Sequence, residues 1–279
     1  MRNKLDNSAF AFIGCGVMGD SIIAGLLQQE IVKPEQIVAS HPREGRRREL
    51  EEKYGISAFE DNAEAVRAIR NAENSNVVLS VKPQRIAAVL HDLAGVVLPK
   101  QNVISIVAGA KIKTIANALK NNRVVRAMPN TPAQIGAGIT AWTCTESVGE
   151  EEREQVKTFF SGFGKELYVE TENMIDMATA LSATGPTYVF MVMEALTDAG
   201  VHLGFSRDMA KELVQEMMLG SIKFAMESHK HPAELRNMVT SPGGTSAEAI
   251  YQMEKGTLRT VLSKAVYAAY TRAVELGKK

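Results

Sequence analysis

A glycine-rich turn near the start of the chain constrains the fold more than any other feature. An apolar run at residues 9–13 leads into it, and an amphipathic helical pattern covers residues 18–29. A strand that breaks into G-x-G-x-x-G and opens a helix is typical of a dinucleotide-binding βαβ unit. The first glycine permits the tight turn, the second lets a pyrophosphate approach the backbone, and the third lets helix and strand pack closely. The residues predicted to contact the cofactor here are Gly14, Cys15, Gly16, Val17, Met18 and Gly19.

The end of the next predicted strand, residues 36–40, indicates which dinucleotide binds. NAD-binding folds usually carry an Asp or Glu there for the ribose hydroxyls, but this chain has Ser40, His41, Pro42 and Arg43. Arginines hold a 2′-phosphate through charge-assisted hydrogen bonds. We expect Ser40 and Arg43 to bind that phosphate, with Arg46 or Arg47 assisting, and NADPH to be preferred over NADH as a weaker substitute. The alternative is that the arginines at 46–48 only form the solvated face of the following helix.

The overall composition excludes several classes of protein. The chain has 279 residues, 45% of them hydrophobic, which suits one large or two ordinary domains. Its 32 basic and 32 acidic residues balance, so no nucleic-acid partner is indicated. No apolar run of about 18 residues and no secretory signal is present, which predicts a cytoplasmic protein without a membrane partner. Cys15 and Cys144 give neither a disulfide framework nor a zinc spacing, and no metal is expected.

Residues 1–170 alternate short β-branched runs with helical stretches, the pattern of a parallel sheet covered on both faces. Strands are predicted at residues 76–81, 102–107, 124–128 and 138–142. In open α/β sheets, ligands bind outside the carboxyl ends of the strands. The residues expected to border the nicotinamide at two such ends are Val81, Lys82, Pro83, Ala108 and Gly109. For Lys82, an exposed strand-end lysine without a ligand is the alternative.

Residues 171–279 lack strand patterns and carry apolar residues at helical spacing. Helices are predicted at residues 174–182, 186–203, 207–228, 232–238, 245–255 and 257–276. The methionines of this half are expected to fill its core. The apolar stripes are broad for so small a domain, so we predict a homodimer that packs these helices together. Assembly of dimers into a larger oligomer is left open.

Two polar, glycine-bearing segments interrupt the helical half, at residues 182–188 and 239–246. Each runs hydroxyl groups and backbone N–H groups into a helix start, a combination that binds small anions such as a carboxylate. Ordinary capped helix starts are the alternative. The doubled glycine at Gly243 and Gly244 favours a ligand, because a capped start needs no such run of small residues.

With these motifs, the chain resembles the pyrroline-5-carboxylate reductases. These enzymes reduce a cyclic imine to L-proline with NAD(P)H, which is the last step of proline biosynthesis. The resemblance runs nearly end to end and is most specific over residues 231–246. It also covers residues 12–19, 81–83, 105–109 and 128–132, together with Gly185, Pro186 and Tyr188. It implies a Rossmann domain followed by an all-α dimerisation domain. It also implies that the small-molecule substrate is held through its carboxylate by Ser241, Gly243, Gly244, Thr245 and Ser246.

The chemistry that this resemblance implies needs a hydride at the C=N carbon and a proton on nitrogen. Because a cyclic imine enters as the iminium near neutral pH, no strongly tuned acid is required, and neither polar segment carries a His or a carboxylate in its loop. Ser246, with Thr245 as substitute, is the predicted catalytic hydroxyl that bonds the ring nitrogen. The family usually has Thr at the position of Ser246, and smaller residues within 182–188.

Two alternatives remain open from the sequence. A hydroxyacid dehydrogenase shares the two-domain plan, but it normally needs a catalytic lysine in the first long helix of its second domain, and residues 188–203 contain none. A reductase-like protein that binds NADPH for regulation, without turnover, is favoured only by the altered residues 182–188.

Overall fold

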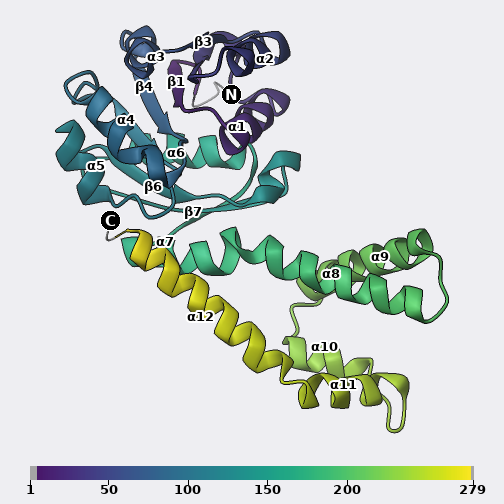
Figure 1. Ribbon diagram of the computed structural model, residues 1–279. Coiled ribbons are helices and arrows are strands. Elements are labelled where there is room, and N and C mark those ends of the chain that lie inside the picture. The colour runs from purple at the N-terminus through teal and green to yellow at the C-terminus, as the bar shows by residue number, and fades with distance from the viewer. Residues whose placement is uncertain (1–4, 278–279) are drawn as a thin grey trace. The chain divides into compact units, whose positions relative to one another are not determined.

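An eight-stranded sheet forms the centre of the N-terminal half, in the order β3-β2-β1-β4-β5-β6-β7-β8 (Figure 1). This is the Rossmann order, and it confirms the predicted α/β fold. The strands are β1 (Ser8–Ile13), β2 (Ile37–Ser40), β3 (Ser57–Phe59), β4 (Asn74–Leu79), β5 (Asn102–Ser105), β6 (Val124–Met128), β7 (Gly138–Cys144) and β8 (Gly164–Tyr168). The computed structural model describes residues 5–277.

One pairing departs from the predicted parallel sheet, because β7 runs antiparallel to β6. A parallel neighbour would need a crossover connection long enough for a helix. Here β6 and β7 are joined by the 3₁₀ turn Thr131–Ile135, which contains Pro132 and is too short for such a crossover. The chain therefore turns straight back, and β8 then pairs in parallel with β7.

The side chains of β1 alternate between two cores, one on each face of the sheet. Phe10 and Phe12 lie in the core beneath α1 (Val17–Gln28), α2 (Glu44–Tyr54) and α6 (Glu150–Ser161). The ring of Phe10 stacks on that of Phe159 with centroids 5.0 Å apart. Ala11 and Ile13 lie in the opposite core, beneath α3 (Asn62–Ile69), α4 (Ile86–Leu93) and α5 (Ile112–Leu119). Burial on both faces makes β1 an interior strand of the sheet.

Several strand ends differ from the predicted ones, and the difference shapes the site. β4 ends at Leu79 and β5 ends at Ser105, two residues before the predicted ends in each case. Val81 and Val107 therefore belong to the loops at the carboxyl edge of the sheet. The prediction missed β3, β8 and the helices α3 to α6, whose short apolar patterns are weak within a single sequence.

The C-terminal half is helical, as predicted. Its helices are α7 (Glu172–Ala178), α8 (Gly185–His202), α9 (Arg207–Ser228), α10 (Pro232–Met238), α11 (Thr245–Lys255) and α12 (Leu258–Leu276). Three of them, α9 to α11, have the predicted bounds, because their starts carry strong signals. The Ser206 hydroxyl caps α9 by accepting a hydrogen bond from the Met209 N–H at 3.3 Å. Pro232 occupies the first turn of α10.

The segment at residues 182–188 is not the polar loop that was predicted. A π-helical turn, Thr179–Ala183, follows α7 directly, and α8 begins at Gly185. The Thr184 N–H donates to the Thr179 carbonyl at 2.9 Å, so the backbone remains helical through this region. The polar residues expected in a loop therefore lie on a helix with a local change of pitch.

The chain divides into two compact units. One comprises the described residues up to Thr184 with the chain from Ala269 onward, and the other comprises Gly185–Ala268. The predicted boundary after residue 170 matches the change from β8 to α7, whereas the first unit also contains α7 and the end of α12. The division of function at residue 170, with cofactor binding before it and substrate binding after it, stays a prediction. None of the helices within residues 5–277 has the length and apolar character needed to cross a membrane.

The helical unit buries little of its own apolar surface. In α9, only Ala210 and Val214 are buried, and α8, α10 and α11 have no buried residue. The prediction that the methionines fill a core is wrong for the single chain: Met191, Met209 and Met226 are more than half exposed. An exposed apolar surface of this extent marks a surface that another protein covers.

Two glycine substitutions test the packing of the sheet unit. A Cβ on Gly25 in α1 would lie 2.8 Å from both the Gly162 carbonyl oxygen and the Phe163 Cβ, whereas one on Gly45 in α2 would meet nothing within 4 Å. We expect Gly25→Ala to lower the free energy of unfolding by about 1–3 kcal/mol. Gly45→Ala should be neutral or stabilising by up to about 1 kcal/mol. Urea denaturation measures both, and equal midpoints for the two variants would contradict this packing.

Candidate active site

The glycine turn after β1 is fastened to the end of β2. The Gly14 N–H donates to Ser40 Oγ at 3.2 Å, and the Cys15 N–H donates to the Ser40 carbonyl at 3.0 Å. Gly14 has a φ of +73°, and a Cβ there would collide with the side chain of Val81. The turn therefore requires glycine at its first position for both conformation and space.

The N–H groups left for a ligand are those of Val17, Met18 and Gly19. They open α1, where no carbonyl one turn earlier can accept them, and Gly16 at the N-cap offers no side-chain cap. A Cβ on Gly16 would meet only the Gly14 carbonyl oxygen, at 3.9 Å, so the space beside Gly16 is open. A helix start with unpaired donors and an approachable backbone fits a pyrophosphate.

Cys15 and Gly19 support this turn from within. Cys15 is fully buried, so only its backbone can face a cofactor. Burial also raises the pKa of its thiol to about 12, which keeps it neutral. A Cβ on Gly19 would lie 3.0 Å from Cys15 Sγ and 3.1 Å from Ser80 Oγ. The third glycine thus serves the close approach of helix and strand that the motif predicts.

A cleft of about 1000 Å³ opens beside Gly14 and Val81, between the carboxyl ends of β1 and β4. The strand order reverses between these two strands, since β2 follows on one side of β1 and β4 lies on the other. Ligands of open α/β sheets bind at such a switch point. The residues lining the cleft are Gly14, Pro42, Glu60, Asp61, Asn62, Ala63, Glu64, Arg67, Val81, Arg85, Ala88, Val89, Asp92 and Val96.

The helices α3 and α4 form walls of this cleft that were not predicted from the sequence. A usable signal was present at the start of α3, where Asp61 precedes an apolar helical pattern. Asp61 caps α3 by accepting hydrogen bonds from the N–H groups of Ala63 at 2.6 Å and Glu64 at 3.0 Å. An aspartate in that position followed by a glutamate three residues later is typical of a helix start.

The structure does not present Ser40 as a phosphate ligand. Its side chain is fully buried, and its hydroxyl donates to Asn62 Oδ1 at 2.8 Å while accepting from Gly14. Ser40 therefore joins the glycine turn, β2 and α3. These internal hydrogen bonds explain why a small hydroxyl residue stands at this position. The sequence pattern alone could not distinguish such a structural role from binding of a phosphate.

The arginines after β2 have separate roles. Arg46 pairs with Asp20 of α1 at 3.2 Å and also donates to the Cys15 carbonyl at 3.4 Å. Arg47 donates to the carbonyls of His41 at 2.9 Å and Pro42 at 3.0 Å. Both guanidinium groups are thus occupied in holding the turn and the chain after β2.

Arg43 is the arginine left for a 2′-phosphate. Its side chain is exposed, and in residues 5–277 its guanidinium forms no ion pair. Its backbone is engaged instead: the N–H donates to His41 Nδ1 at 3.2 Å, and the carbonyl accepts from the N–H groups of Arg46 and Arg47. Arg48, by contrast, pairs with Glu44 one turn earlier. Burial, followed by the charges of Arg43 and Arg46, lowers the pKa of His41, so the ring stays neutral and its Nδ1 can accept.

The loops after β4 and β5 hold the other residues expected at the nicotinamide. Val81 lies against the glycine turn, and Lys82 is exposed at the start of the 3₁₀ turn Pro83–Arg85. Ala108 is partly buried, and Gly109 has a φ of +76° with no room for a Cβ, which would lie 2.9 Å from Leu276. The structure thus brings Val81 into the cleft and places Ala108 and Gly109 after the neighbouring strand β5.

The segment at residues 241–246 forms the start of α11 in the helical unit. The Gly244 N–H donates to the Ser241 carbonyl at 3.0 Å, which closes a turn. Pro242 and Gly243, the latter with a φ of +70°, occupy the positions that a type II turn gives to these residues. No side chain in residues 5–277 caps α11, so its first N–H groups, those of Thr245 and Ser246, have no capping partner there.

These features define a class: an oxidoreductase with a Rossmann fold and a helical second unit, in which α11 begins without a side-chain cap. A family model for pyrroline-5-carboxylate reductase dimerisation matches residues 172–276, and one for coenzyme F420-dependent NADP oxidoreductase matches residues 9–109. The chain belongs to the pyrroline-5-carboxylate reductase family.

Individual relatives support that assignment over almost the whole chain. The pyrroline-5-carboxylate reductase of Pseudomonas aeruginosa is 40% identical over 96% of this chain and 97% of its own length. That of Synechocystis is 38% identical, with the same coverage. The crystal structure of Plasmodium falciparum pyrroline carboxylate reductase with NADP bound is 28% identical and superposes with a TM-score of 0.88, covering 98% of this chain and 99% of that one.

Gly16→Ala and Gly14→Ala separate cofactor binding from folding. Because the space beside Gly16 is open in the protein alone, Gly16→Ala should leave the thermal midpoint unchanged while raising the Kd for NADPH at least about tenfold. Gly14→Ala should lower the midpoint as well, since its Cβ collides with Val81 in a left-handed conformation. Calorimetry and isothermal titration measure the two effects. Unimpaired NADPH binding by Gly16→Ala would remove this turn from the cofactor site.

Proposed function

We propose that this protein reduces 1-pyrroline-5-carboxylate to L-proline with NADPH. The observation that carries the proposal is the pair of uncapped helix starts, at Val17 for a pyrophosphate and at Thr245 for a carboxylate, in a chain of this family. In this proposal residues 1–170 hold the cofactor, and residues 171–279 hold the substrate and form the dimer.

The residues at the start of α11 bind and orient the substrate. The N–H groups of Thr245 and Ser246 and the positive end of the helix dipole hold the carboxylate, with Ser241, Gly243 and Gly244 shaping the turn around it. The Ser246 hydroxyl, or that of Thr245, accepts a hydrogen bond from the protonated ring nitrogen. The cofactor supplies a hydride for the C=N carbon when it is bound. Since the substrate enters as an iminium, the protein's main tasks are orientation and exclusion of water.

The cofactor preference follows from the chain after β2. No carboxylate stands at the end of β2 to accept hydrogen bonds from the ribose of NAD, and Arg43 presents an unengaged guanidinium there. The relative with NADP bound supports the same preference. NADH is proposed as a weaker substitute because it lacks the phosphate that Arg43 would bind.

A homodimer is the proposed assembly. The exposed apolar side chains of α8 and α9, among them Phe190, Leu213 and Ile222, form a surface that a second copy would cover. The match to a dimerisation family over residues 172–276 supports this assignment. The cytoplasmic location and any larger assembly of dimers stay predictions.

Steady-state kinetics with pyrroline-5-carboxylate test the function and the role of Arg43 together. Oxidation of NADPH is followed with the imine, and reduction of NADP⁺ is followed separately with a hydroxyacid. We expect turnover with the imine alone. Arg43→Ala should raise the KM for NADPH about tenfold, the loss of one charge-assisted hydrogen bond, and leave the KM for NADH within about twofold.

Arg48→Ala is the matched control, since Arg48 lies in α2, which Arg43 precedes, and within residues 5–277 its ion pair is with Glu44. It should leave both KM values unchanged. No turnover with the imine by protein that binds NADPH would contradict the proposed activity. Equal effects of Arg43→Ala on both cofactors would contradict the role of Arg43 alone.

A further inference from the structure

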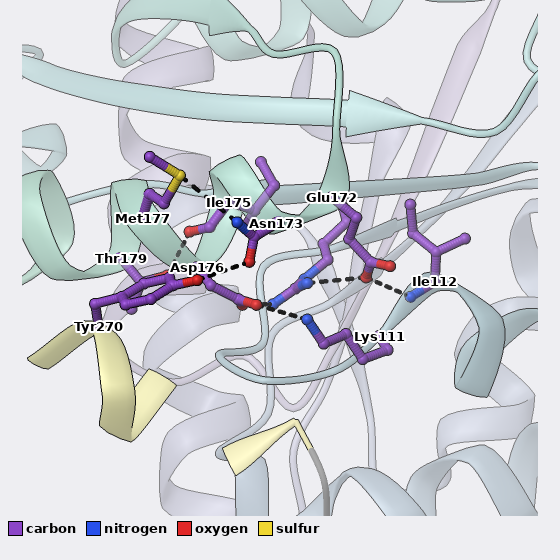
Figure 2. A network of polar contacts seen from close by, with 10 residues as sticks. Lys111, Ile112, Glu172, Asn173, Ile175, Asp176, Met177, Thr179 and Tyr270 are labelled. Atoms are coloured by element: carbon purple, nitrogen blue, oxygen red, sulfur yellow. Dashed lines mark hydrogen bonds and ion pairs between the residues drawn. The ribbon is translucent and has the colours of Figure 1, made fainter. Parts of the chain in front are cut away.

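Four charged side chains form a cluster beside the loop that follows β5, in which Arg126 and Asp176 are buried while Lys111 and Glu172 are partly exposed (Figure 2). Arg126 of β6 is fully buried and contacts Glu172 at 2.8 Å and Asp176 at 2.7 Å, both on α7. Lys111, at the end of the loop, contacts the other oxygen of Asp176 at 2.6 Å. The cluster has two positive and two negative charges, so it is balanced.

The cluster also holds the backbone of this loop. Glu172 accepts a hydrogen bond from the Ile112 N–H at 2.8 Å, at the first residue of α5 (Figure 2). Asp176 holds the side chain of Lys111, the residue that precedes Ile112. The chain from Lys111 to Ile112 is therefore tied to α7 through both a side chain and a main-chain group.

The end of α12 closes the other side of the loop. Gly109 lies against the backbone of Leu276 so closely that a Cβ would be 2.9 Å away. The Tyr270 hydroxyl of α12 donates to Asn173 Oδ1 on α7 at 3.0 Å (Figure 2). Residues 108–112 are thus held between α7 and the last turns of α12, all within the sheet unit.

Stability alone does not explain a cluster of this kind. Buried ion pairs cost desolvation energy, and apolar residues of similar volume often stabilise a protein as well or better. Arg126 Nε is buried and has no hydrogen-bond partner in the described part of the chain, so the guanidinium is not fully paired either. The cluster does fix the orientation of the side chains and backbone groups that it contacts, because hydrogen bonds between charged groups have a defined geometry.

We propose that Lys111 is a positioning residue for the nicotinamide half of the cofactor. Through Asp176 and Arg126, it holds Ala108 and Gly109 at one place at the carboxyl end of β5. The inference rests on the proposed NADPH site, in which Ala108 and Gly109 border the nicotinamide. It assigns the cluster a role in binding one half of the cofactor, away from the pyrophosphate donors at Val17.

Two ligands separate positioning from general damage to the fold. NADPH spans both halves of the site, whereas adenosine 2′,5′-bisphosphate occupies only the adenosine half. Lys111→Met should raise the Kd for NADPH about tenfold and leave the Kd for adenosine 2′,5′-bisphosphate within about twofold, by isothermal titration. Lys111→Arg, which can still pair with Asp176, should restore NADPH binding. Lys113→Met, an exposed lysine two residues further on, is the matched control and should bind both ligands normally.

Hydrogen exchange gives a second measurement without any cofactor. The Ala110 N–H donates to the Val107 carbonyl at 3.2 Å, and its exchange should accelerate in Lys111→Met but not in Lys113→Met. Unchanged NADPH affinity, or equal weakening of both ligands, would overturn the proposal. Because binding is measured rather than turnover, wild-type protein that binds NADPH but does not reduce the imine would refute the proposed function without affecting this result.

Discussion

The hydrogen bonds made by Ser40 are the interaction on which the rest of the site depends. Its hydroxyl accepts from the Gly14 N–H and donates to Asn62, and its carbonyl accepts from the Cys15 N–H. One buried residue at the end of β2 thereby fixes the glycine turn, the start of α3 and the mouth of the cleft. It also occupies the N–H groups of Gly14 and Cys15, and the Gly16 N–H donates to the Gly14 carbonyl at 2.7 Å, so the donors offered to a ligand begin at Val17.

The charged residues around the cofactor site follow a similar division between support and binding. Arg46 and Arg47 are occupied by Asp20, Glu60 and backbone carbonyls, and they fix the chain after β2. The backbone next to Arg43 is therefore held in place while its guanidinium stays available. Such preorganisation lowers the entropic cost of binding a phosphate. Lys111 and Arg126 are likewise paired, and their carboxylate partners on α7 orient a loop rather than touch a ligand.

Much of the fold could be predicted from the sequence, because local signals coincided with the global structure. The glycine turn, β6 and helices α9 to α11 carry strong patterns of period, capping or turn chemistry. The strand β3 and the helices α3, α4 and α5 are short and were missed, as was the longer α6. The walls that α3 and α4 contribute to the cleft were therefore missed as well. The antiparallel direction of β7 was not predicted, although the short connection between β6 and β7 in the sequence indicates it.

The site was predicted less completely, for a physical reason. A motif identifies which residue types gather at a turn, but it does not show which of their groups are already paired. Ser40 and Arg43 were indistinguishable as phosphate ligands in the sequence, and only the contacts of Asn62 and Gly14 show that Ser40 is internal. The polar residues 182–188 were misassigned because a π-helical turn has no clear sequence signal.

Tracing the hydride tests most directly whether a cofactor bound over Val17, Met18 and Gly19 reduces a cyclic imine. NADPH deuterated at either face of nicotinamide C4 is supplied with pyrroline-5-carboxylate, and the product is analysed by mass spectrometry and NMR. One of the two labelled cofactors should give proline carrying a single deuterium at the former imine carbon, and the other should give unlabelled proline. Consumption of both labelled cofactors without deuterium in the proline, or no consumption despite binding, would contradict direct transfer.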